Sequence, residues 1–161
     1  MKKKWFGLLL SVCMILSLLP ALGTAAGAAA PSGTCGTGVS WTLNGTVLTV
    51  SGAGKMTPGD DHTYSFGAYK DTITAVVIGE GVTGIGEGAF YQYPNLASVT
   101  AASSVRDVGG LAFNACPKLA AVTFKGSGVE VGANAFARCT ALTAVPAGLG
   151  DLEMGAFSGC T

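Results

Sequence analysis

The stretch Gly109–Leu119, GGLAFNACPKL, has two close counterparts in the same chain, and together the three copies decide the fold. The counterparts are GEGAFYQYPNL at Gly86–Leu96 and GANAFARCTAL at Gly132–Leu142. Each copy begins with glycine, carries an Ala-Phe pair at the same place and ends on a leucine six residues after the phenylalanine. Copies that recur at a fixed step of 23 residues indicate an array of stacked units, because self-similarity at a constant period is typical of repeat proteins.

Columns of equivalent residues extend this repeat over the second half of the chain. The aromatic column consists of Phe90, Phe113, Phe136 and Phe157, each of which follows an alanine. The leucine column consists of Ile73, Leu96, Leu119 and Leu142. Two further apolar columns are Val76, Val99, Val122 and Val145, and Ile85, Val108, Val131 and Leu152. The last unit is two residues short, so we expect about four coils over residues 73–161 with a truncated final coil.

Each unit predicts one short strand and one tight turn. The segments ITAVVI at 73–78 and LAAVTF at 119–124 are short, β-branched and alternating, which indicates strands. The Ala-Phe segment is too short for an independent helix and favours a single helical or 3-10 turn. One unit cannot fold alone, because ordering it costs about 35 kcal/mol and would require roughly 1,400 Å² of buried apolar surface. We therefore expect an α/β solenoid with ladders of equivalent residues through its core.

This pattern resembles that of a known family. The succession L-x-x-V-x-I, V-x-x-I-G and A-F-x-x-C-x-x-L, from about Ile73 to the end, resembles the BspA-like leucine-rich repeats of bacterial surface proteins. Residues 35–56, CGTGVSWTLNGTVLTVSGAGKM, are similar to the small β module that often precedes such repeats. The resemblance implies a right-handed leucine-rich-repeat array and a role in adhesion or host-protein binding. The chain departs from the pattern at Ala101 and Ala147, where the family prefers isoleucine, and at Tyr93, where later units carry cysteine.

Residues 1–30 predict a secretory signal peptide. Lysines at positions 2–4 precede an apolar run at Phe6–Leu19, and small residues follow, with cleavage expected at about Ala26 to Ala30. A transmembrane anchor is the alternative, but a span needs about 20 apolar residues and this run is shorter. Cleavage would leave a protein that is secreted or held at the cell surface without membrane insertion.

The charge of the exported part argues against two classes of partner. Nine basic and nine acidic residues balance over the whole chain. Loss of Lys2, Lys3 and Lys4 leaves six basic against nine acidic residues, which is a net charge of −3. The sequence has no basic stripe, so it lacks the electrostatic footprint of a nucleic-acid binder, and an anionic membrane surface is an equally poor partner.

Residues 31–72 predict an N-terminal cap followed by an aromatic loop. Trp41–Val50, WTLNGTVLTV, contains two alternating strands joined by Asn44-Gly45, a pair that favours the type I′ turn of a β-hairpin. We expect this hairpin to cover the first coil, with Trp41 sealing the core; a binding role for that ring is the alternative. The irregular stretch Met56–Thr72 gathers aromatic residues, so it is either a recognition loop for protein or glycan or a loop pinned by its own rings.

Four tyrosines are the candidate ligand contacts. Tyr64, Tyr69, Tyr91 and Tyr93 belong to this loop and to the first coil, and we expect them to form one binding patch for an extracellular protein or glycan. The outward positions of the strands instead carry small uncharged residues: Ala75, Val77, Ser98, Thr100, Ala121, Thr123, Ala144 and Pro146. This strand face lacks Trp, Tyr and Arg, the residue types enriched at interface hot spots, so we do not expect it to be the binding surface.

Three cysteines, Cys116, Cys139 and Cys160, each follow the repeat phenylalanine by three residues. In an exported protein such residues suggest disulfides, but equivalent positions in successive coils form a ladder that selects no pairs. We therefore expect free thiols buried beside the phenylalanines, with bridges as the alternative. Cys35 has no evident partner. A structural zinc site needs about four ligands, and His62 is the only histidine, so neither a metal nor a cofactor is expected.

The sequence contains no evident catalytic arrangement. A Ser-His-Asp or Cys-His arrangement needs a histidine oriented by other groups, whereas His62 lies in a glycine-flanked loop. The acidic residues are scattered through turns, whereas a glycosidase needs two facing carboxylates. The sequence therefore predicts a non-enzymatic binding module, secreted or at the cell surface. The alternatives are a structural spacer that presents another domain and the non-catalytic part of a larger secreted enzyme.

Overall fold

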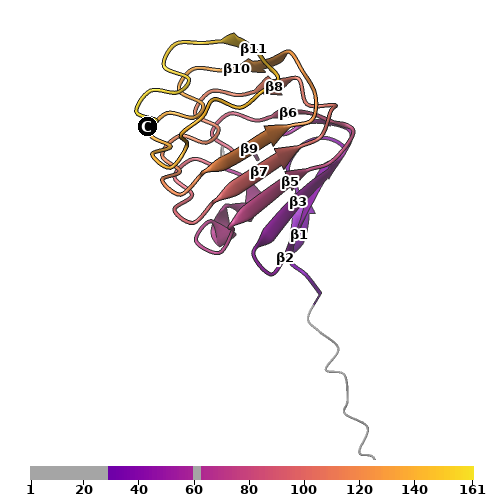
Figure 1. The fold of residues 1–161 in the computed structure, drawn as a ribbon. Coiled ribbons are helices and arrows are strands. Elements are labelled where there is room, and N and C mark those ends of the chain that lie inside the picture. The colour runs from indigo at the N-terminus through magenta and orange to yellow at the C-terminus, as the bar shows by residue number, and fades with distance from the viewer. Residues whose placement is uncertain (1–28, 60–62) are drawn as a thin grey trace, which may run out of the picture.

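The structure is a computed structural model that describes residues 29–59 and 63–161. These residues form a β-solenoid of about three turns, in which short strands from successive coils stack into two sheets (Figure 1). The predicted signal peptide, apart from Ala29 and Ala30, lies outside the described residues, as does His62. Within the described ranges, no helix has the length and apolar character needed to cross a bilayer.

The first sheet contains six strands in the order β1, β2, β3, β5, β7 and β9. Their bounds are Ser32–Thr34, Val39–Asn44, Val47–Gly52, Ala75–Ile78, Ser98–Ala101 and Ala121–Phe124. Strands β3, β5, β7 and β9 pair in parallel, and Val76, Val99 and Val122 lie in register across the last three. Strand β7 buries its second and fourth residues, which is the alternation that the sequence predicts.

The second sheet contains β4, β6, β8, β10 and β11, and its strands pair only in parallel. Their bounds are Gly54–Lys55, Val82–Ile85, Asp107–Val108, Val129–Val131 and Leu149–Leu152. This sheet forms another side of the coils, so the central units contribute one strand to each sheet (Figure 1). The apolar residues of both sheets point into one shared core.

The predicted N-terminal hairpin is present, and it is continuous with the solenoid sheet rather than a separate lid. Strands β2 and β3 pair antiparallel around the Asn44-Gly45 turn, where Gly45 has a φ of 59°. Strand β3 also pairs in parallel with β5, so the second strand of the hairpin is the first parallel strand of the sheet. Trp41 is buried, and its indole N–H donates to Ser65 Oγ at 2.7 Å, which supports the sealing role.

A column of stacked aromatic rings runs along the core. The rings of Phe90, Phe113, Phe136 and Phe157 follow one another at centroid distances of 5.1 to 5.2 Å. The leucine column lies buried in the same core: Leu96, Leu119 and Leu142. The aromatic column continues before the first repeat, with Phe66 at 5.3 Å from Phe90 and Tyr64 at 5.2 Å from Phe66. The repeat pattern does not reveal Phe66, which precedes Phe90 by 24 residues and follows a serine instead of an alanine.

The helical part of the α/β prediction is not confirmed. The only helix among the described residues is a 3-10 helix, η1, at Ser65–Tyr69, and the Ala-Phe segments of the repeats are turns. In each of these turns two residues four positions apart have positive φ, for example Gly88 at 61° and Gln92 at 58°. Left-handed residues at this spacing interrupt any helical run, because a helix needs negative φ at every position. The architecture is therefore a β-solenoid.

The last coil departs most from the predicted columns. This unit adds no strand to the first sheet, and Val145 is 63% exposed although its column predicts burial. Pro146, predicted to face outward, is buried, and a proline has no N–H to donate to a strand ladder. Leu152 is exposed, and Phe157 and Cys160 are only partly buried. The aromatic column thus continues into a coil whose strand region has lost the repeat pattern.

Candidate functional site

The four candidate tyrosines do not form one surface patch. Tyr64 and Tyr93 expose only 7% and 3% of their surface, because their rings pack against the aromatic column. Tyr69 is partly buried, with its ring 5.9 Å from that of Trp41. Of the four, Tyr91 presents the most surface to solvent, with 45% exposed. The burial of both rings in the core argues against Tyr64 and Tyr93 as ligand contacts.

Burial also removes these two hydroxyls from acid-base chemistry. Desolvation raises the pKa of Tyr64 and of Tyr93 well above the usual value for a tyrosine. Neither hydroxyl has a hydrogen-bond partner among the described residues. The hydroxyl of Tyr64 lies so close to Gly86 that a Cβ at that glycine would overlap it. Both tyrosines therefore stay uncharged, and their rings pack in the N-terminal part of the core.

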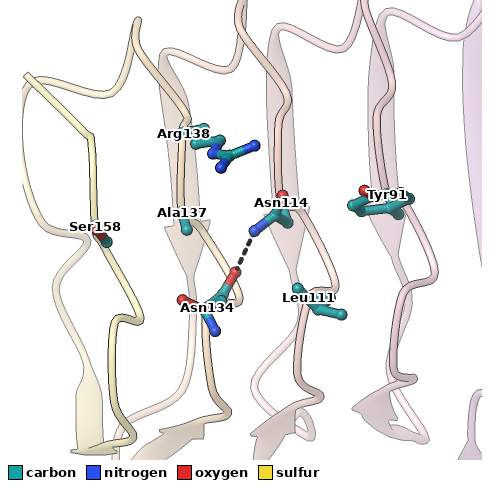
Figure 2. A pocket seen from close by; sticks show the side chains of 7 residues that line it. All are labelled: Tyr91, Leu111, Asn114, Asn134, Ala137, Arg138 and Ser158. Atoms are coloured by element: carbon teal, nitrogen blue, oxygen red, sulfur yellow. Dashed lines mark hydrogen bonds between the residues drawn. The ribbon is translucent and has the colours of Figure 1, made fainter.

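Tyr91 stands at one end of a trough on the turn side of the coils. The residue directly after each repeat phenylalanine forms a column here: Tyr91, Asn114, Ala137 and Ser158. With Leu111, Asn134 and Arg138, these residues line a shallow depression of about 330 Å³ (Figure 2). Because the column takes one residue from each unit, the trough crosses all four repeat units along the axis of the solenoid.

Left-handed backbone at the flanking positions builds the walls of the trough. Leu111 and Asn134 have φ of 58° and 56°, and Arg138 has a φ of 62°. A non-glycine residue in this region costs roughly 1 to 2 kcal/mol, so the surrounding structure must hold it there. These side chains flank Asn114 and Ala137, which are buried and form the floor (Figure 2).

Backbone carbonyl and N–H groups along the trough form hydrogen bonds between neighbouring coils. The carbonyls of Asn114, Ala137 and Ser158 accept from the N–H groups of Gln92, Ala115 and Arg138 at 2.9, 2.8 and 2.7 Å. The N–H groups of Leu111 and Asn134 likewise donate to carbonyls of the next coil. These bonds explain why the left-handed residues keep their conformation. They also mean that a ligand in the trough meets side chains and not an open strand edge.

The side chains of the trough offer one cation, one aromatic ring and several amide and hydroxyl groups. Asn114 Nδ2 donates to the backbone oxygen of Asn134 at 3.3 Å, which orients the amide. At the rim, Gln92 Nε2 donates to the hydroxyl of Tyr91 at 3.2 Å. The Arg138 guanidinium is exposed and forms no ion pair within residues 29–59 and 63–161. Among the described residues, no carboxylate lines the trough.

Sequence reasoning found Tyr91 and missed the other lining residues. A signal was present, because the column one place after the phenylalanine can be traced with the same steps as the phenylalanines themselves. The sequence contains no comparable signal for the residues that form the walls of the trough. Leu111 and Arg138 are not residue types enriched at positive φ, so their left-handed conformation follows from the stacking of coils and not from local preference.

A second depression, of about 430 Å³, lies on the second sheet and is acidic. Its charged lining consists of Lys55, Asp107, Glu130, Asp151 and Glu153. Lys55 Nζ pairs with Asp107 Oδ2 at 2.5 Å, and Glu153 Oε2 accepts from the N–H of Ala133 at 2.9 Å. In the part of the chain that the structure describes, no group of three or more His, Cys, Asp or Glu side chains could hold a metal ion. Two of the four carboxylates of this depression are thus engaged within the protein.

The repeat cysteines are free thiols, and each donates a hydrogen bond to the backbone carbonyl of a phenylalanine in the aromatic column. The thiols of Cys116, Cys139 and Cys160 donate at 3.1 Å to the carbonyls of Phe90, Phe113 and Phe136. Burial raises the pKa of Cys116 to about 12 and that of Cys139 and Cys35 to about 11. Since these values lie above the unfolded value of 9.0, the thiols contribute stability that is fully present below pH 9 and is lost as the pH rises through about 11 to 12.

Alkylation should separate the cysteines by burial. At pH 8 we expect Cys116 and Cys139 to react with iodoacetamide about 100-fold more slowly in the folded chain than in urea, because the thiolate is the reactive form. Cys160, which is partly exposed, should react first. Peptide-resolved mass spectrometry after timed quenching measures each rate. Equal rates for Cys116 and Cys160 in the folded chain would contradict the buried ladder.

Comparison with sequence families decides what kind of array this is. The profile of the BspA type leucine rich repeat region matches residues 62–161, in six copies. The chain belongs to this family. The family recognised from the repeat columns is therefore confirmed. Among curated proteins, none matches the sequence.

Solved structures of bacterial leucine-rich-repeat proteins are similar to this BspA-type array. A leucine-rich repeat protein from Eubacterium ventriosum is 22% identical with a TM-score of 0.54, over 69% of this chain and 36% of that one. A leucine rich cell surface protein from Faecalibacterium prausnitzii is 21% identical with a TM-score of 0.47, over 81% of this chain and 35% of that one. A leucine-rich repeat protein from Bacteroides capillosus is 26% identical with a TM-score of 0.47, over 74% and 87% of the two chains. The chain spans about a third of the length of the first two.

The two sides of this BspA-type array differ in what they can bind. On the strand side, the exposed positions of β5, β7 and β9 are small and uncharged, and Val77 is the largest of them. On the turn side, the trough combines an exposed aromatic ring, a guanidinium and amide groups. Tyrosine and arginine are the residue types that supply most binding energy at interfaces. The trough is therefore the candidate functional site.

Proposed function

We propose that this BspA-type chain is a non-enzymatic binding module that recognises an extracellular protein or glycan. Leucine-rich repeats are generally non-enzymatic binding folds, which supports the class of function. The predicted signal peptide at residues 1–30 supports a location outside the cell, either secreted or attached to the surface. Adhesion is the role that the family resemblance suggests for such a module.

The observation that carries this proposal is the trough on the turn side. It places Tyr91 on the first coil and Arg138 on the third coil of one rigid scaffold, with Asn114 on the coil between them and Asn134 on the same coil as Arg138. The backbone hydrogen bonds between coils hold these side chains in place before any ligand arrives. Preorganisation of this kind favours affinity, because little conformational entropy remains to be lost on binding.

Substitution of Tyr91 tests the proposed site. We expect Tyr91→Ala to weaken binding about tenfold or more, because an aromatic anchor at the end of a trough is the typical hot spot. The measurement is a comparison of wild type and variant on a printed glycan array and a panel of purified extracellular-matrix proteins, with dissociation constants determined for each probe that wild type binds.

Val77→Ser is the matched control, because it removes an exposed apolar side chain from the strand side and leaves the trough intact. Both variants should keep the melting temperature of wild type, since neither side chain fills the core. Loss of binding in Val77→Ser with full binding in Tyr91→Ala would move the site to the strand side and refute the assignment.

The strand side favours a second candidate function, that of a structural spacer. Thr49, Val77, Thr100 and Thr123 lie in register across four strands and form a flat row without charge. A rigid solenoid with such a surface can present other parts of a protein without binding anything itself. If the folded chain binds no glycan and no matrix protein in the assay above, the spacer function replaces the binding module.

A further inference from the structure

We infer that the trough binds an acidic glycan, with a sugar carboxylate on Arg138 and a sugar ring against Tyr91. This inference rests on the proposed function and narrows its ligand from extracellular proteins and glycans to one chemical class. Four features of the trough support it: its direction across the coils, the hydrogen bonds that its backbone already makes, its small apolar content and its single charge without an ionic partner.

The direction of the trough selects an elongated ligand. Its central column, from Tyr91 to Ser158, takes one residue from each of four units. Stacked strands lie about 4.8 Å apart, so three steps span roughly 14 Å. This is about the length of three linked sugar rings or of four extended amino-acid residues. The ligand must therefore lie along the solenoid axis, across the strands instead of beside one of them.

The saturated backbone favours a sugar chain over an extended peptide. A peptide strand usually gains its affinity by pairing with the free backbone edge of a sheet. In the trough the carbonyls of Asn114, Ala137 and Ser158 already accept from the preceding coil, so no such edge is available. A sugar chain needs no backbone partner, because its hydroxyls pair with side-chain amides and hydroxyls. Asn114, Asn134 and Ser158 supply such groups.

The apolar content of the trough excludes a third kind of ligand. An amphipathic helix needs a hydrophobic groove for a series of apolar anchors. Here Leu111 and Ala137 are the aliphatic lining residues, and Tyr91 is the single ring. The hydroxyl of that ring is held by Gln92 Nε2 at 3.2 Å, so its orientation is constrained from the rim. An oriented tyrosine suits the apolar face of a sugar, since such a ring has an apolar body and a polar tip.

The charge of the trough selects an acid. Arg138 is its only charged lining residue, and the guanidinium has no ionic partner within residues 29–59 and 63–161. A guanidinium matches a carboxylate with two parallel hydrogen bonds, which is a geometry that an ammonium group does not reproduce. The acidic groups around Lys55 lie in a separate depression, so they do not line the place where the acid would bind. The sugar acid can be a uronic acid or a sialic acid, because both present a carboxylate on a ring.

Two pairs of glycans test the inference on the full chain. The first pair is α-1,4-linked trigalacturonate and its carboxyl-reduced counterpart, and the second is 3′-sialyllactose and lactose. We expect wild type to bind at least one acidic member about tenfold or more tightly than its neutral counterpart, as for the loss of one charge-assisted pair. Whichever acidic member binds distinguishes the uronic from the sialic source. The preference should weaken with rising ionic strength, because the pair is exposed to screening.

Arg138→Gln is the variant that decides the role of the guanidinium. Gln92 occupies the corresponding position of the first coil with a φ of 58°, so glutamine is already accommodated in this left-handed conformation. We expect this variant to lose the preference for the acidic glycan and to keep the melting temperature of wild type. Lys125→Gln is the matched control, since it removes one positive charge from an exposed position outside the trough and should leave the preference unchanged. Arg138→Lys, which keeps the charge without the planar fork, should retain only part of the preference.

Several results would overturn the inference. Equal affinity for the acidic and neutral members, or an acidic preference that persists in Arg138→Gln, would remove the carboxylate from the trough. Binding to matrix proteins alone, lost in Tyr91→Ala, would overturn the acidic glycan while the proposed function stands. Absence of binding to every glycan and protein probe by the folded chain would overturn both.

Discussion

Replacing Phe113 by aspartate should abolish the cooperative unfolding transition of the whole array. The ring of Phe113 is fully buried between Phe90 at 5.2 Å and Phe136 at 5.1 Å. Removing a buried phenylalanine costs about 3 to 5 kcal/mol, and the aspartate adds an unpaired carboxylate in the core. The sum is comparable with the total stability of a typical domain, which is about 5 to 15 kcal/mol. Far-UV circular dichroism and a thermal melt of the purified chain measure the loss of the sheet signal and of the transition.

Phe113→Leu separates the effect of charge from that of ring loss. Leucine keeps the site apolar, so we expect a folded chain that has lost roughly 1 to 3 kcal/mol and still melts cooperatively. Tyr91→Ala, at the exposed end of the trough, should melt like wild type. A melting curve of Phe113→Asp that overlays the wild-type curve would refute the stacked column, because no folded solenoid tolerates a free carboxylate between two rings.

The stacked column is the part of the fold that sequence reasoning predicts best. A fixed period identifies which residues are equivalent, and equivalent residues must stack when units too small to fold alone cover one another. The same argument predicts that the strand at Val99 pairs in register with the strands at Val76 and Val122. Alternation then predicts which side of each strand is buried. None of these steps needs the detailed conformation of the turns.

The parts that sequence reasoning does not predict depend on contacts between coils. The turns are not helical because residues such as Leu111 and Arg138 adopt positive φ, and the hydrogen bonds that hold them come from adjacent coils. Tyr64 extends the aromatic column although its surroundings in the sequence are those of a loop. In the last unit, Pro146 breaks the strand where the period predicts one. For the turns and for Tyr64 the deciding interaction joins residues that are distant in sequence, whereas Pro146 acts locally because it has no N–H to donate to a strand ladder.

The candidate site, too, could be predicted from the sequence only in part. Tyr91 was accessible to sequence reasoning because an aromatic residue outside the core columns is unusual. Tyr93 does not share a surface with Tyr91, because the ring of Tyr91 is exposed while the ring of Tyr93, two residues later in the turn, is buried in the core. Arg138 and Asn114 come from different units, and only the stacking of the coils brings both into the lining of one trough.

Replacing Gly109 by alanine should destabilise the chain by about 3 kcal/mol, although the change adds a single methyl group. A Cβ at Gly109 would lie 2.6 Å from Glu87 N and 2.9 Å from the carbonyl carbon of Gly86. These atoms belong to the backbone of the preceding coil, so no side-chain rotation relieves the overlap and the two coils must separate. Gly132 meets the backbone of its own preceding coil in the same way, at 2.6 Å from Gly110 N. The glycine of the repeat pattern therefore sets the spacing of the coils.

Two other glycines provide the controls for this substitution. Gly67→Ala places its Cβ in open space and should change the stability by less than about 0.5 kcal/mol. Gly88→Ala also meets no neighbour, but its φ of 61° should cost roughly 1 kcal/mol. Urea unfolding of the three variants measures the order, which we expect to be Gly109→Ala, Gly88→Ala and Gly67→Ala from least to most stable. If Gly109→Ala proved as stable as Gly67→Ala, close backbone contact would not determine how these coils stack, and the spacing would have to come from the aromatic column alone.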